Sequence, residues 1–277
     1  MEKAAKRNSF ETRIHEIDLL RGILMTLVIL DHFLNILASY NLGWAGGKVA
    51  IEAGTALEPY VTIYRLASLY WDSLFRQIFR YIALGAFCFV SGISCAFSRN
   101  NWKRAGQMIL FWALIFILTN ILESIRISNG LDLGIRTARV DFNIIGVLAW
   151  STLIYCFVQN KQWRWLLAIT IIALAIHPIF VSLSKTSWGQ NAYVPFLWEP
   201  SRTVADQADY MPLFPYLGFF FGGALLAKFT YSVNKQSYFK RYEWERPFCY
   251  IGRHSLIFYA THYIILIAIF SFVGLFI

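Results

Sequence analysis

The hydrophobic positions of this chain come in long runs separated by shorter polar segments. Each run has about 20 residues, the length that an α-helix needs to cross a bilayer. The runs cover residues 17–40, 79–97, 105–122, 142–158, 163–183, 211–229 and 251–277. The pattern predicts an all-α fold, a polytopic transmembrane helical bundle of about seven spans. We expect residues 1–277 to form a single integral-membrane domain, with residues 1–16 as a cytoplasmic N-terminal segment.

The composition supports a fold in an apolar solvent. Hydrophobic side chains make up 57% of the 277 residues and charged ones only 15%. This balance argues strongly against a water-soluble globule. The 18% of aromatic residues also argues against intrinsic disorder.

The net charge of +9 would suggest a nucleic-acid partner in a soluble protein. Here the basic residues flank the apolar runs, so we expect no nucleic acid. With a cytoplasmic N-terminus, 16 of the 25 Lys and Arg residues fall on the cytoplasmic side, which favours that orientation. The semi-apolar segment 57–75 is either an interfacial helix or an extra span that would invert everything after it.

The four cysteines lie in or beside apolar runs and have no C-x-x-C spacing; they are Cys88, Cys95, Cys156 and Cys249. The pattern predicts buried packing thiols, with neither a disulfide framework nor a metal site.

Two predicted outer segments, 41–77 and 184–210, are longer than ordinary connections and rich in aromatic residues. They either roof a cavity that opens to the outside or form an aromatic belt at the membrane interface. Composition does not choose between these two interpretations.

Ionisable residues inside apolar runs are candidates for a functional site, because lipid makes them costly. At 100° per residue, Asp18, Arg21 and His32 share one face of the first helix. Asp31 and Asn35 form an adjoining polar strip. Asp18 and Arg21 are one turn apart, and we favour a structural ion pair for them. His32 lies about 21 Å beyond Asp18 along the axis. There it either transfers protons or contacts a substrate, or it only hydrogen-bonds to a neighbouring helix.

The last run carries a second polar set. Ser255, Tyr259 and His262 lie within about 60° of one another, and His262 lies about 12 Å deeper than His254. Before the sixth run, Asp209 either caps the helix or binds a substrate from the outer side.

In order along the chain, five motifs resemble the heparan-alpha-glucosaminide N-acetyltransferase catalytic-domain family, in its short bacterial form, and more distantly the wider membrane acyltransferases. They are R-I-H-E-I-D-L-L-R-G followed by D-H, V-S-G-I-S-C-A-F-S-R, I-I-G-V-L, D-Y-M-P-L-F-P-Y-L-G and I-G-R-H-S-L-I-F-Y-A-T-H. By resemblance, the first-helix motif includes Asp18, Arg21, Gly22 and His32, and the later motifs include Asp209, Ser255 and His262. The family's proposed catalytic histidine lies in the first outer loop, and residues 41–77 contain no histidine.

The resemblance implies a bacterial plasma-membrane enzyme that moves an acetyl or other acyl group from cytoplasmic acyl-CoA to a sugar or glycan on the other side. Acetyl-CoA is the expected donor, and no metal is expected. We expect His32 to act as base. The residues expected to assist in catalysis are His262, Asp18, Arg21 and Ser255. Those expected to bind substrate are Asp31, Asn35, Asp209 and Tyr259. The cations expected to bind the CoA phosphates are Lys103, Arg104 and Arg253.

Two other functions fit the same residues. Intramembrane His, Asp and Arg residues also build proton-coupled transporters, although the chain shows no internal repeat of the kind common in them. A non-catalytic scaffold would use the buried ions only to fix helix register. Neither the acceptor nor the oligomeric state follows from the sequence.

Overall fold

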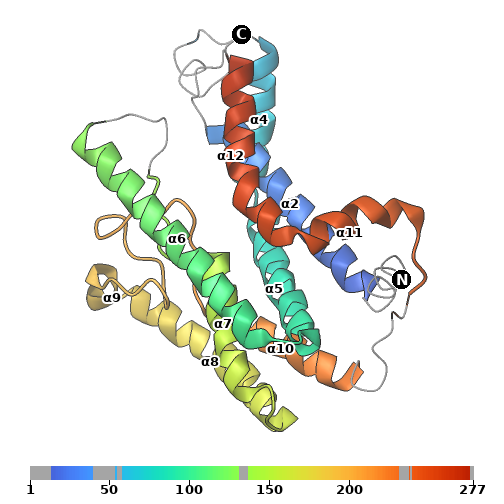
Figure 1. Cartoon of the computed structure of the whole chain (residues 1–277). Helices are drawn as coiled ribbons and strands as arrows, with labels where there is room; N and C mark the ends of the chain where they lie inside the picture. The colour runs from blue at the N-terminus through green and yellow to red at the C-terminus, as the bar shows by residue number, and fades with distance from the viewer. Residues whose placement is uncertain are drawn as a thin grey trace. The chain divides into compact units, whose positions relative to one another are not determined.

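The computed structural model describes residues 14–39, 54, 58–130, 137–230, 237 and 239–274. The regular structure in these residues is helical (Figure 1). The elements are α2 (His15–Ser39), α4 (Glu58–Trp71), α5 (Leu74–Phe97), α6 (Asn101–Ser128), α7 (Ile144–Val158), α8 (Trp163–Ser184), α9 (Ser187–Asn191), α10 (Tyr216–Thr230), the 3-10 helix η1 (Glu243–Glu245), α11 (Arg246–Arg253) and α12 (Ser255–Gly274). Each predicted apolar run therefore contains a helix.

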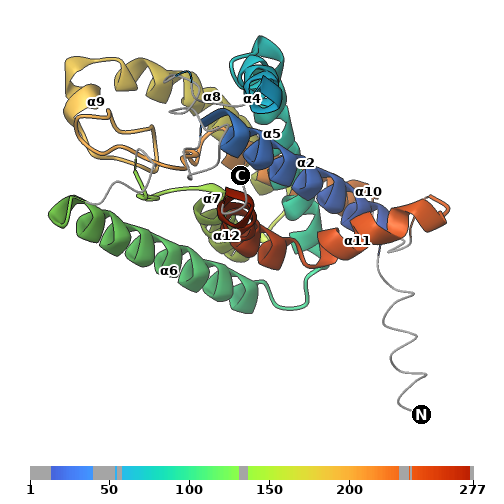
Figure 2. The same cartoon turned by 90° about the horizontal axis from the view of Figure 1, so that it is seen from above.

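The chain divides into two compact units. Unit 1 comprises residues 1–83 and 235–277, and unit 2 comprises residues 84–234. In unit 1, α2 packs against α4, α11 and α12 (Figure 2). In unit 2, α7 packs against α6 and α10, and α8 packs against α9 and α10. The division does not test the predicted single domain, which stays a prediction.

Among the residues that the structure describes, three helices, α5, α6 and α8, are long and apolar enough to cross a membrane, and a fourth span results if the bent pair of the segment 243–253 and α12 counts as one. The helices α7 and α10 are apolar but have only 15 residues each. The all-helical, membrane-type fold is thus confirmed. The described residues do not confirm seven spans, so that number stays a prediction.

The last predicted span is not one continuous helix. The chain bends by 84° between the segment 243–253 and α12. His254 is the C-cap of α11: its N–H donates to the carbonyls of Tyr250 and Ile251, and its own carbonyl accepts from Ile257 and Phe258 as α12 begins. The single apolar run 251–277 therefore contains two helices with a bend between them, where Gly252 and Arg253 are held against α2.

Two glycines set the contact between α2 and α11. A Cβ atom on Gly22 would lie 1.8 Å from the carbonyl oxygen of Phe248, and one on Gly252 would lie 1.8 Å from that of Asp18. Such distances are far inside van der Waals contact, so each helix needs a residue without a side chain at this point. The backbones of α2 and α11 therefore meet directly.

The prediction that the cysteines are buried packing thiols is confirmed. The four thiols are buried and free. In unit 2, α7 supplies much of the core, because ten of its residues are buried. By contrast, α6 has a row of exposed Leu and Ile side chains, as expected for a helix that faces lipid.

Candidate functional site

The two histidines singled out from the first and last helices meet in unit 1. His262 Nε2 lies 2.8 Å from His32 Nδ1, although the residues are 230 positions apart in sequence. The ring centroids are 4.8 Å apart. His262 is buried and His32 is partly buried. The structure thus brings together the two residues that we predicted to be central to the site.

The partners of His262 define the tautomer of the pair. Its Nδ1 lies 2.8 Å from the carbonyl oxygen of Tyr259 and 3.1 Å from that of Phe258. Carbonyl oxygens only accept hydrogen bonds, so Nδ1 of His262 carries a proton and, in the neutral ring, Nε2 accepts. His32 must then donate from Nδ1. In the neutral pair, the basic lone pair of His32 is consequently on its Nε2 atom.

A second contact joins α2 to α11 in the same unit. Arg253 Nε donates to Asp18 Oδ2 at 3.0 Å. The sequence predicts Arg253 at the CoA phosphates, and Asp18 in an ion pair with Arg21 or in catalysis. The structure gives Asp18 a partner on another helix, and most of both side chains is buried. The Asp18–Arg253 pair therefore fixes α11 against α2.

Asp31, next to His32 in sequence, belongs to a network that we did not predict. Arg76 Nε and Nη2 donate to its two carboxylate oxygens, each at 2.9 Å. The hydroxyl of Tyr70 donates to Oδ1 at 3.0 Å. The guanidinium of Arg76 also lies 3.5 Å above the ring of Trp71. Asp31, which we expected to bind substrate, thus has its carboxylate held by groups of α4 and α5.

The remaining predicted residues of unit 1 lie on the same helices. Arg21 and Asn35 are partly buried on α2. The ring of Tyr259 lies 5.6 Å from that of His262, between centroids. Ser255 is the first residue of α12, roughly 10 Å before His262 along the axis. Tyr259 is therefore beside the histidine pair, whereas Ser255 is two turns away.

Three predicted residues lie in unit 2. Lys103 and Arg104 are in the first turn of α6, where the side chain of Asn100 accepts a hydrogen bond from the backbone of Lys103 at 2.9 Å. Asp209 lies in the loop before α10. Because α10 begins at Tyr216, Asp209 is too far from its start to be the helix cap.

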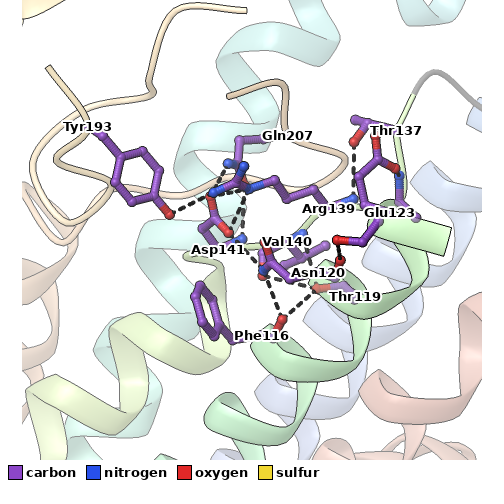
Figure 3. Close-up of polar contacts among 12 residues, drawn as sticks. Phe116, Thr119, Asn120, Glu123, Thr137, Arg139, Val140, Asp141, Tyr193 and Gln207 are labelled. Atoms are coloured by element: carbon purple, nitrogen blue, oxygen red, sulfur yellow. Dashed lines mark hydrogen bonds and ion pairs between the residues drawn. The ribbon is translucent and has the colours of Figure 1, made fainter. Parts of the chain in front are cut away.

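Unit 2 also holds a polar cluster centred on Asp141, which the sequence reasoning missed (Figure 3). The side chain of Asp141 is fully buried, with 0% exposed. Arg139 Nε donates to both carboxylate oxygens, at 2.8 and 3.0 Å, and Asn120 donates to Oδ1 at 3.0 Å. Gln207 donates to Oδ2 and accepts from the Asp141 backbone. The sequence feature that could have pointed to this cluster is an Asp directly before the apolar run 142–158.

These hydrogen bonds determine the ionisation of Asp141. Burial alone would raise its pKa, but the hydrogen bonds from Arg139, Asn120 and Gln207 outweigh burial and hold the pKa below its ordinary value of 3.8. The charged form is therefore favoured in the folded chain. The cluster joins α6, the start of α7 and the loop before α10.

Because the pKa of Asp141 is lower in the folded than in the unfolded chain, its contribution to stability is complete above 3.8 and is lost as the pH falls through the folded value. We expect Asp141→Asn to reduce stability at neutral pH by about 1–3 kcal/mol. The deficit relative to wild type should shrink as the pH falls below 3.8. Melting temperatures of the wild type and of Asp141→Asn, from neutral pH to acidic pH, measure this stability deficit. A deficit that does not change with pH would contradict this assignment.

The fold and the histidine pair define a class: a helical membrane protein with titratable groups held between two of its helices. The chain belongs to the heparan-alpha-glucosaminide N-acetyltransferase catalytic family, whose model matches residues 60–264. Comparisons with curated proteins and with solved structures gave no match. Membership makes the chain an acetyltransferase-type membrane enzyme. The matched range includes His262 but not α2, so the resemblance of the first-helix motif lies outside it.

Proposed function

We propose that this protein transfers an acetyl group from cytoplasmic acetyl-CoA to a sugar or glycan acceptor on the extracytoplasmic side of a bacterial plasma membrane. The observation that carries the proposal is the family match over residues 60–264. The excess of Lys and Arg on one predicted side supports a cytoplasmic N-terminus.

In this proposal, His32 is the general base. Its Nε2 atom accepts the proton of the acceptor hydroxyl or amine as that oxygen or nitrogen attacks the carbonyl carbon of the thioester. A bond forms between the acceptor and the acetyl carbon, and the bond from that carbon to sulfur breaks. The proton then moves to the leaving thiolate of CoA, so the histidines end in their starting state.

His262 supports this step by sharing the positive charge. When Nε2 of His32 takes a proton, the proton on Nδ1 of the same ring can pass to Nε2 of His262 over the 2.8 Å hydrogen bond. The other nitrogen of His262 faces the carbonyl oxygens of Phe258 and Tyr259. Two carbonyl dipoles stabilise an imidazolium at that position.

The other predicted residues receive the following roles in the proposal. Tyr259 and Asn35, on the two helices that carry the histidines, contact the acceptor. Asp209 stays a predicted substrate-binding residue. Lys103 and Arg104 bind the CoA phosphates. The ion pair of Asp18 with Arg253 holds α2 against α11. Asp31 is paired with Arg76 and has a positioning role. Arg21 and Ser255 stay predicted members of the site.

The proposal is tested with purified protein in nanodiscs, labelled acetyl-CoA and a panel of sugars and lipid-linked glycans. We expect a labelled acetyl ester or amide, with CoA released in equal amount. If no product forms and proteoliposomes instead carry an unmodified solute across the bilayer, the protein is a transporter and the proposal is wrong.

A further inference from the structure

The surface of unit 2 has a hollow at α9 that the proposed chemistry does not use. It has a volume of about 370 Å³ and is lined by Ser187, Trp188, Asn191 and Ala192. Trp188 is 63% exposed. An aromatic ring beside hydroxyl and amide groups is a combination of apolar surface with a few polar groups, as in sites for small molecules.

The hollow is held in a fixed shape by its supports. Thr186 accepts a hydrogen bond from the backbone of Gly189 at 3.1 Å. A Cβ atom on Gly189 would lie 2.1 Å from the carbonyl oxygen of Leu183, so α9 is packed directly against the end of α8. The buried Trp198 donates to the carbonyl of Gly189 at 3.1 Å and lies edge-on to Trp188, at 5.7 Å between centroids. The ring of Trp188 is thereby positioned before any ligand binds.

Tyr193 extends this surface. It is two residues beyond Asn191, which places the two within about 7 Å along the backbone. Tyr193 is 45% exposed, while its hydroxyl is turned towards Arg139 and accepts from Nη2 at 3.1 Å (Figure 3). Tyrosines of a membrane belt place the polar end in the water phase. Here the polar end is tied to the protein and the ring is presented to the surroundings.

Arg139 offers hydrogen-bond donors beside this ring. Its Nε atom is fixed on buried Asp141, and the side chain is 28% exposed. The two N–H groups of Nη1 have no hydrogen-bond acceptor among the described residues. Because Asp141 balances the charge of Arg139, the pair is suited to neutral acceptors such as hydroxyl groups more than to an anion.

From these observations we infer that Trp188, Asn191, Tyr193 and Arg139 form a carbohydrate-binding site on unit 2. The rings of Trp188 and Tyr193 stack on the apolar faces of sugar rings, and Arg139, Asn191 and Ser187 bond to hydroxyl groups. The inference rests on the proposed function in one respect, namely that the bound sugar is part of the acceptor. Sugar binding itself does not require turnover.

The test measures binding of neutral tetrasaccharides of glucose and of N-acetylglucosamine to the full chain in nanodiscs, by calorimetry and without acetyl-CoA. We expect at least one tetrasaccharide to bind, and Trp188→Ala or Tyr193→Ala to weaken it about tenfold or more. Asn191→Ala is a milder variant with the same expected direction, for use if the aromatic variants do not fold. Trp165→Ala, which removes a Trp of similar exposure (58%) from α8, should leave binding unchanged.

If the enzyme is active, Trp188→Ala should raise KM for a tetrasaccharide acceptor about tenfold while leaving kcat, and KM for a monosaccharide, unchanged. If turnover is absent but tetrasaccharides bind through these residues, the proposed function fails and the binding site stands. The site is wrong if no tetrasaccharide binds the wild type, or if Trp188→Ala and Asn191→Ala bind as well as wild type. Quenching of Trp188 by brominated lipid together with absent sugar binding would identify a membrane-interface belt instead.

Discussion

His32→Ala and His262→Ala are each expected to reduce acetyl transfer by about a hundredfold to ten-thousandfold, the usual contribution of a positioned acid or base. His32 supplies the basic nitrogen in our proposal, and His262 accepts the hydrogen bond that orients His32 and receives part of its charge. Product formation from labelled acetyl-CoA measures the loss, with size-exclusion profiles as the check on folding.

The double variant distinguishes a working pair from two independent residues. Since the two imidazoles act as one unit, His32→Ala/His262→Ala should be little worse than either single variant. The matched control is His254→Ala, since His254 is exposed and lies at the bend before α12. It should keep wild-type turnover. Folded single variants that remain fully active would show that the pair has only a structural role.

Gly22→Ala and Gly252→Ala are expected to destabilise the protein by about 2–3 kcal/mol each, the upper part of the usual range for overpacking. In each case the new methyl group would lie 1.8 Å from a backbone carbonyl oxygen of the facing helix. A backbone cannot move aside as a flexible side chain can, so α2 and α11 must separate. The same separation would strain the Asp18–Arg253 ion pair.

Melting temperature in detergent measures this effect, and the chain provides a matched control. Gly106 is also within a long helix, α6, but a Cβ atom there would meet nothing within 4 Å. Gly106→Ala should therefore be neutral or raise stability by about 0.5–1 kcal/mol, because alanine favours the helix. Equal melting temperatures for Gly22→Ala, Gly252→Ala and wild type would contradict the direct backbone contact.

The functional site shows where sequence reasoning succeeds. Helical periodicity placed His32 and His262 on polar faces of two helices, and the structure puts these faces in contact. Periodicity could not supply the partners of Asp18 and Asp31. Arg253 is 235 residues from Asp18, and Arg76 is 45 residues from Asp31. Sequence spacing suggested the local pair of Asp18 with Arg21 because only neighbours on one helix can be judged from spacing.

The Asp141 cluster shows the opposite case. Asp141 and Arg139 are two residues apart in a polar connection, where charged residues are common and usually solvated. Their burial follows from the loop before α10, which brings Gln207 to Asp141 and pairs its backbone with residues 139 and 142. A loop without periodic structure carries no pattern from which such an approach could be predicted.

The sequence by itself determined that the chain is helical, that its helices suit a membrane, which family it belongs to, and which helix faces are polar. The helical fold, its membrane character and the polar faces follow from local composition and from the 3.6-residue period. The family follows from the resemblance of the motifs and from the match of the family model. Only the tertiary structure decided the bend at His254, the ion pairs of Asp18 and Asp31, and the contact between the two imidazoles. The period fixes the direction in which a side chain leaves its own helix, whereas its partner depends on which other helix packs there and at what height.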